Sequence, residues 1–211
     1  MKKFQSVIQL INNEKGTYIG DLRAYFRHMW KTNNVDHPYH NMRHMLHVLW
    51  HTHRGLITYP EITPAEIRIT LIAAIFHDDK HPGKIGNDSD NIAVAIKSLQ
   101  ENILPEDKDY EEQIILCIQA TQFPHIEADF PLYAKLLRDV DVASTLNDVW
   151  VQNVLFGLGR EFGKTPEEML KMQLSFLPQL KFETRWAKNE YGKRVRSRIE
   201  EVKAMIECLK I

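Results

Sequence analysis

Apolar residues recur along nearly the whole chain with the three-and-four spacing of an amphipathic helix. No strand-like alternation of useful length interrupts this pattern. The sequence therefore predicts an all-α fold, a compact bundle of about seven to nine helices joined by short loops. The spacing is seen at Leu22, Tyr25, Phe26 and Met29, at Met42, Met45, Leu46 and Leu49, and at Ile67, Leu71, Ala74 and Ile75.

Two of the expected helices have clear start signals. Thr63 and Thr165 are each followed by a proline and then by acidic residues within the first turn. This combination is typical of helix N-termini. Further helices are expected from near Asp88 and near Glu111, over about 130–146, 148–160 and 166–180, and from about 186 to the end.

The size and charge of the chain limit its class. Its 211 residues are enough to bury a hydrophobic core and suit one domain over residues 1–211. The formal net charge of −1 provides no overall attraction for nucleic acid or for an anionic membrane. The apolar run at 71–76 is far too short to cross a bilayer. Nucleic acid and membranes are therefore not expected as partners, and the oligomeric state stays open.

The compartment is predicted from the cysteines and the N-terminus. Cys117 and Cys208 are too few for a disulfide framework, which favours a reducing environment. Residues 1–16 have a basic start but lack the long apolar segment and small-residue cleavage site of a signal peptide. A cytoplasmic protein is expected.

The histidines are unevenly distributed. All ten lie between His28 and His125, and seven of them fall within residues 28–53. A lone histidine or aspartate on a helix is usually a surface group or a satisfied core group. Three segments depart from that ordinary explanation because they combine histidines and acids in helical contexts.

The first two segments supply imidazoles and one carboxylate. His40, His44 and His47 are spaced so that all three can share one face of a helix. His77 and Asp78 follow an apolar helix directly, a position where polar groups are costly unless they are paired or act as ligands. Both segments therefore point to a site at helix ends.

The third segment contains Asp139 and Asp141, two acids that interrupt an otherwise apolar helix. Together the three segments offer two imidazoles and two carboxylates. Such a mixed nitrogen and oxygen set suits Zn, Mn, Fe or Mg and does not suit metals that prefer thiolates. At this level either acid of the pair can complete the set.

Taken in order, these residues resemble the HD-domain metal-dependent phosphohydrolases. Within that superfamily the chain is most similar to the catalytic core of class I cyclic nucleotide phosphodiesterases. The matching segments are Tyr39–His44, His77–Gly83, the run from Asp141 to Ser144, and the late pair Gln173 and Phe176. Lys80 stands where the family has an acid, and it either places a cation beside the metal site or turns outward.

The resemblance implies a role for each matching residue. His44, His77, Asp78 and Asp141 would hold a first divalent metal, with Asp78 bridging to a second, and a metal-bound hydroxide would attack phosphorus. One or two ions are implied, and Mn, Mg, Zn, Fe and Co are not distinguished. His40 would be the general acid, His81 would bond the attacking water, and Gln173 and Phe176 would hold a purine ring.

The implied function is hydrolysis of a phosphoester in a small-molecule nucleotide, most sharply a 3′,5′-cyclic nucleotide. Two alternatives stay open at this point. One is an HD-type nucleotidase acting on phosphomonoesters. The other is a non-catalytic HD domain that senses a nucleotide, which Lys80 and Gln122 keep in view because they replace acids of the family pattern.

Overall fold

The computed structural model describes residues 6–32 and 37–210, and within these ranges it contains helices and loops but no strand. The predicted all-α fold is confirmed. Ten α-helices are present in the described residues, more than the expected number because α1 and α8 are only five and three residues long. The α-helices are α1 Val7–Ile11, α2 Arg23–Thr32, α3 Met42–Leu56, α4 Pro64–Phe76, α5 Asp88–Asn102, α6 Glu111–Ala120, α7 Leu132–Val142, α8 Gly159–Glu161, α9 Pro166–Phe176 and α10 Arg185–Leu209.

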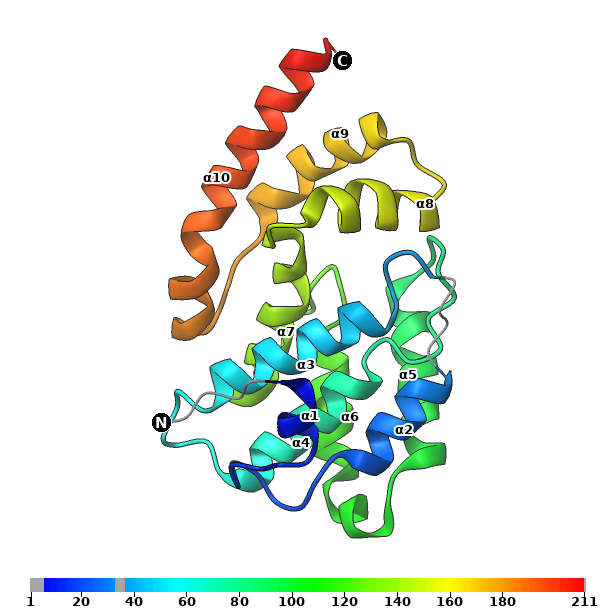
Figure 1. Cartoon of the computed structure of the whole chain (residues 1–211), viewed down its shortest axis with the longest axis vertical. Helices are drawn as coiled ribbons and strands as arrows, with labels where there is room; N and C mark the ends of the chain where they lie inside the picture. The colour runs from blue at the N-terminus through cyan, green and yellow to red at the C-terminus, as the bar shows by residue number, and fades with distance from the viewer. Residues whose placement is uncertain (1–5, 33–36, 211) are drawn as a thin grey trace.

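Helix α4 lies at the centre of the lower part of the molecule and contacts α2, α3, α5, α6 and α7 (Figure 1). Thr63 and Glu66 form a capping box at its start, and Pro64 occupies the first turn. All residues from Ile67 to Phe76 are buried. A helix that is apolar on every side can be buried on every side, so α4 delivers its C-terminal end into the interior.

The core consists of two hydrophobic clusters that divide along the chain. The first contains buried residues from Leu10 to Val140, and the second those from Ala143 to Val202. Helix α7 runs upward from the first cluster, and the 3-10 turn η2, Ala143–Leu146, continues it to α8, α9 and α10 (Figure 1). The candidate site lies where the clusters meet. One domain over residues 1–211 stays a prediction.

The segment expected to be an ordinary helix near 148–160 differs from that expectation. Residues Val151–Leu158 form η3, a π-helix, which continues directly into α8. Gly157 lies against the backbone of Pro38, because a Cβ there would be 3.0 Å from the Pro38 carbonyl oxygen. The missing side chain therefore lets η3 pack closely on the segment that precedes α3.

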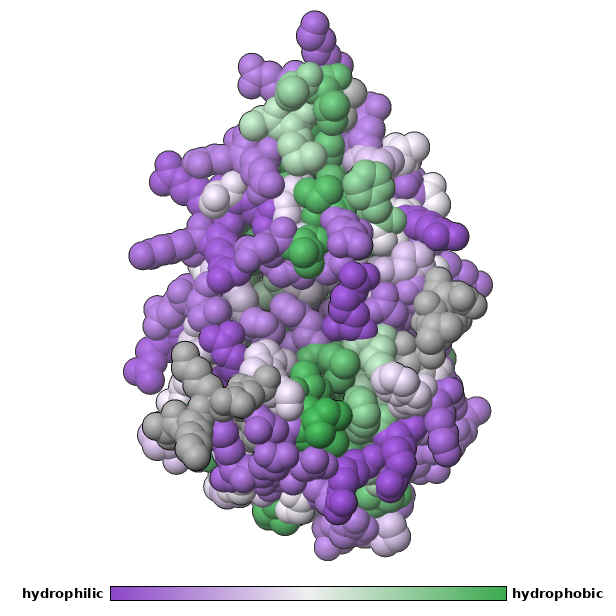
Figure 2. All heavy atoms as spheres, in the orientation of Figure 1, coloured by the Kyte–Doolittle hydropathy of each residue, from purple (hydrophilic) through white to green (hydrophobic). Residues whose placement is uncertain are grey.

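The surface in Figure 2 is mostly hydrophilic, with smaller apolar areas over the lower helices and along the upper ones. No helix among the described residues has the length and apolar character needed to cross a membrane.

Candidate metal centre

The first predicted ligand, His44, lies in the first turn of α3. Asn41 caps this helix, and its side chain accepts from the backbone N–H groups of Arg43 and His44. The side chain of His44 is buried, only 5% exposed. The cap thus fixes the start of α3 and, with it, the direction in which His44 enters the interior.

His77 and Asp78 lie at the C-terminal end of α4. The His77 side chain is fully buried, and its Nδ1 lies 3.0 Å from the carbonyl oxygen of Ala74. Nδ1–H donates to that carbonyl, so Nε2 is the nitrogen that faces Asp78 and Asp141. A backbone bond on the other ring nitrogen is the usual way in which a protein orients a metal-binding histidine.

His44, His77, Asp78 and Asp141 converge, and we call them the quartet. One ligand atom from each lies within 4.8 Å of all the others. The Nε2 atoms of the two histidines are 3.4 Å apart, and each is 3.1 Å from Asp78 Oδ2. Asp141 Oδ1 is 3.2 Å from His44 and 3.4 Å from His77. Three helices and one turn, separated in sequence, thus aim four donors at one point.

The quartet fits a divalent transition-metal ion. Bonds of about 2.0–2.2 Å to one cation place neighbouring ligand atoms about 3.0–3.5 Å apart, which matches the spacing of the four atoms. Two imidazoles and two carboxylates are also the donor types that such ions accept. The quartet could therefore hold a metal, and its residues leave the identity of that metal open.

Without a cation, protons hold the quartet together. Burial by itself would lower the pKa of His44, but hydrogen bonds with Asp141 and Asp78 outweigh it and raise the pKa to about 9. The pKa of His77 is raised well above its ordinary value in the same way, against the effect of burial. Burial would raise the pKa of Asp141, but the two histidines lower it to about 2. A metal would replace these shared protons.

The choice between Asp139 and Asp141 is clear in the geometry. Only Asp141 belongs to the quartet. Asp139 is 1% exposed and turns to the other side of α7, where it accepts from the backbone N–H groups of Glu183 and Thr184 and from the Thr184 hydroxyl. Thr184 is the N-cap of α10. Asp139 therefore anchors the start of α10 to α7.

His40, the predicted general acid, is paired with a residue that was not predicted. Its Nδ1 lies 2.5 Å from Glu161 Oε2, and Glu161 Oε1 accepts from the backbone N–H groups of Tyr39 and His40. Burial would raise the pKa of Glu161, but the hydrogen bond with His40 outweighs it and lowers the pKa. Both carboxylate oxygens are thus engaged, and the ring Nε2 of His40 is left for a ligand.

His81 stacks on His40, with ring centroids 3.7 Å apart. Its Nδ1 accepts from the backbone N–H of Gly83 at 3.0 Å. Burial, together with the charge of His40, lowers the pKa of His81 to about 4. His40, His81 and Glu161 also lie close enough to surround an ion, but the hydrogen bonds of Glu161 identify the group as a bonded pair with a neutral imidazole beside it.

Asp79 and Lys80 follow Asp78 in the sequence, and both are paired with residues outside the quartet. Lys80 turns outward, with Nζ 3.3 Å from the exposed Glu101, so it places no cation at the centre. Asp79 is buried and accepts from His28, Thr32 and Ser98. These bonds tie the turn that carries Asp78 to α2 and α5.

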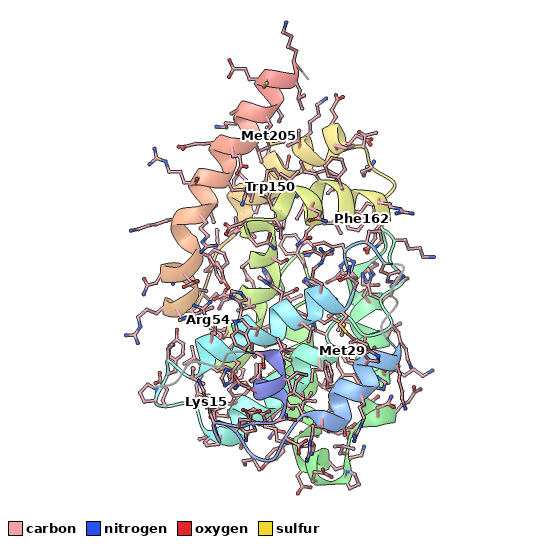
Figure 3. The ribbon with its side chains drawn as sticks, in the orientation of Figure 1. Lys15, Met29, Arg54, Trp150, Phe162 and Met205 are labelled. Carbon is pink, nitrogen blue, oxygen red and sulfur yellow. The ribbon has the colours of Figure 1, made fainter. Side chains whose placement is uncertain are left out.

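A cavity of about 160 Å³ opens onto the quartet, and we call it the metal-site cavity. Phe176 lines it and packs edge-on against Phe123, with centroids 5.3 Å apart. Phe162 lines it as well, at the junction of α8 with the lower helices (Figure 3). Gln173, the other residue of the predicted purine clamp, is buried on α9 outside this lining, and its Oε1 has no hydrogen-bond partner among the described residues.

No known family model matches the chain, and no curated protein sequence is significantly similar to it.

Proposed function

We propose that the protein is a metal-dependent phosphohydrolase that cleaves a phosphoester in a nucleotide, most sharply a 3′,5′-cyclic nucleotide. One observation carries the proposal: the quartet and His40, whose ring is bonded to Glu161, line the same cavity. A metal centre beside an oriented imidazole can support phosphoester hydrolysis, because the reaction is helped by charge neutralisation and by a proton for the leaving oxygen.

His44, His77, Asp78 and Asp141 would hold the ion. A divalent ion there would supply activation of water and neutralisation of the phosphate charge. The side chains of His44 and His77 are almost completely buried, whereas those of Asp78 and Asp141 are 16% and 20% exposed, so the site is partly shielded from solvent. The lining also contains the apolar side chains of Leu158, Phe162 and Phe176, together with polar residues such as Asp88, Asn91 and Thr121.

His40 is the residue suited to proton transfer. Glu161 fixes its ring through Nδ1 and through the backbone, so Nε2 is the atom that would deliver a proton to the leaving oxygen. An imidazole can give and regain a proton near neutral pH. His81, with its Nδ1 engaged by Gly83, keeps Nε2 for a hydrogen bond with water or phosphate.

Lys80 is the one cation that replaces an acid of the family pattern. Its side chain points away from the quartet and does not compete with a metal. This favours a functional centre over a non-catalytic nucleotide sensor. Gln122 is the remaining departure from the pattern. Phosphomonoester and phosphodiester substrates share the chemistry proposed for the quartet, so the test includes both.

The test is a panel assay of cyclic and linear nucleotides with Mn, Mg, Fe, Co or Zn, using the wild type and two variants. We expect His44→Ala to lose bound metal and hydrolysis together, and His40→Ala to keep the metal and lose turnover. His47→Gln, one turn further along α3, serves as the control. Absence of phosphoester turnover by the wild type with every ion would refute the proposal.

A further inference from the structure

A second and larger cavity lies next to the metal-site cavity, and we call it the Arg138 cavity. Its volume is about 750 Å³. Phe123 lines both cavities, so one aromatic ring forms their common border. The other lining residues come from the loop after α6, from α7 and from the segment after α9.

The volumes of the metal-site cavity and the Arg138 cavity indicate that a nucleotide would occupy both of them. Pockets that enclose organic ligands usually measure about 300–1,000 Å³. The metal-site cavity, at about 160 Å³, is large enough for a phosphate group but not for the nucleoside as well. A substrate bound through its phosphate at the quartet therefore needs a second space for the rest of the molecule, and the Arg138 cavity has the required size.

Two chain segments besides Phe123 run from one cavity to the other. On α7, Arg138 lies one helical turn before Asp141 of the quartet. At the end of α9, Phe176 of the metal-site cavity is followed by Pro178 and Gln179 of the Arg138 cavity. The spaces are therefore neighbours along continuous walls, and a ligand that passes Phe123 occupies both.

The polar groups of the Arg138 cavity are fixed and balanced in charge. The Arg138 side chain is only 8% exposed, and its guanidinium bonds Glu183 Oε1 at 2.7 Å, His125 Nδ1 at 2.5 Å and the carbonyl oxygen of Ile126 at 3.2 Å. Because Glu183 compensates Arg138, the cavity has no strong preference for an ion. Lys181 and Glu127 are a second pair of opposite charges in the lining.

Among the remaining lining residues, Phe123, Pro124, Ile126 and Pro178 are apolar. A fixed set of donors and acceptors between apolar faces suits a planar, uncharged, polar ring. Among the parts of a nucleotide, the base has this chemistry.

We propose that the Arg138 cavity binds the nucleoside portion of a nucleotide whose phosphate lies at the quartet. The proposal rests on the proposed function and assigns the base to a place different from the predicted Gln173 clamp. Phe123 then separates the reacting phosphate from the part of the substrate that determines specificity.

The test fills the Arg138 cavity without touching the quartet. Ala128→Trp and Gln179→Trp place bulk at two exposed lining positions, and Asp129→Trp is the matched control, since the Asp129 side chain is fully exposed on the same loop. The measurements are KM for a hydrolysed nucleotide, the inhibition constant of inorganic phosphate, bound metal and thermal unfolding.

We expect either filled variant to raise KM for the nucleotide about tenfold or more and to change phosphate inhibition less than about twofold. The control should match the wild type in both. Unchanged KM in both filled variants, or an equal rise in KM and in the phosphate inhibition constant, would overturn this proposal while leaving the proposed function intact. A wild type that hydrolyses no nucleotide would overturn both.

Discussion

Glu161 lies 2.5 Å from His40, although 121 residues separate them in the chain. The same carboxylate accepts two backbone N–H groups at Tyr39 and His40. It therefore holds the backbone at Tyr39 and His40 as well as the imidazole ring.

Glu161→Gln should lower kcat about ten- to a hundredfold while KM and bound metal stay near wild type. The amide keeps the size of the side chain but loses the charge that orients the His40 ring. Glu167→Gln, an exposed position on α9 paired with Lys171, is the control. A large loss of bound metal in Glu161→Gln would instead mean that Glu161 supports the quartet.

Substitutions of the two aspartates of α7 should have different effects, one mainly on the stability of the fold and the other on metal binding. Asp139→Asn should lower the free energy of unfolding by about 1–3 kcal/mol, because its amide N–H₂ meets backbone donors at Glu183 and Thr184 in a buried place. Asp141→Asn should lose bound metal, whereas Asp139→Asn should keep it. Denaturant unfolding measures the loss of stability, and metal analysis measures the loss of metal. Loss of metal in Asp139→Asn, with metal retained in Asp141→Asn, would contradict the geometry.

A single methyl group added at Gly157 should disturb the close contact of η3 with Pro38. Gly157→Ala puts a Cβ 3.0 Å from the Pro38 carbonyl oxygen, so the backbone that leads to His40 must shift. We expect lower kcat with bound metal unchanged. Gly192→Ala on α10 meets no atom within 4 Å and should stabilise its helix by about 0.5–1 kcal/mol. Equal kcat in both variants would show that the contact does not position His40.

Acid should weaken the fold through His53, which is 1% exposed and bonded to the Thr17 hydroxyl. Burial, with a smaller effect of Lys15, lowers the pKa of His53 to about 4 from 6.5. The unfolded chain therefore binds more protons at this histidine than the folded protein does. The free energy of unfolding falls as pH drops from 6.5 toward 4 and then levels off. His53→Gln should reduce this slope in urea unfolding, and an unchanged slope would exclude His53 as a contributor.

The sequence predicted the parts of this molecule that depend on local periodicity. The apolar spacing of α4 and the capping signals at Thr63 and Thr165 correspond to observed helices. The quartet could be anticipated because its members stand at helix ends or interrupt apolar helices. Asp141 could be chosen over Asp139 only by resemblance, because residues two apart can face opposite sides of a helix.

Other features left no local signal. Glu161 is one acid among many in the sequence, and only the packing of η3 on Pro38 brings it to His40. The apolar residues of Val151–Leu158 are equally compatible with a π-helix and with the α-helix that was expected there. Gln173 follows a family pattern, but its helix buries it away from the metal-site cavity.

The boundary between the two hydrophobic clusters has a consequence for how this molecule can change. All four quartet residues precede Ala143, where the second cluster begins, whereas Glu161, Phe162 and Phe176 follow it. Substitutions in the last third of the chain can therefore change the lining of the metal-site cavity and the partner of His40 without replacing a residue of the quartet. Recombination near residue 142 would keep the quartet and His40 and exchange the residue that bonds His40.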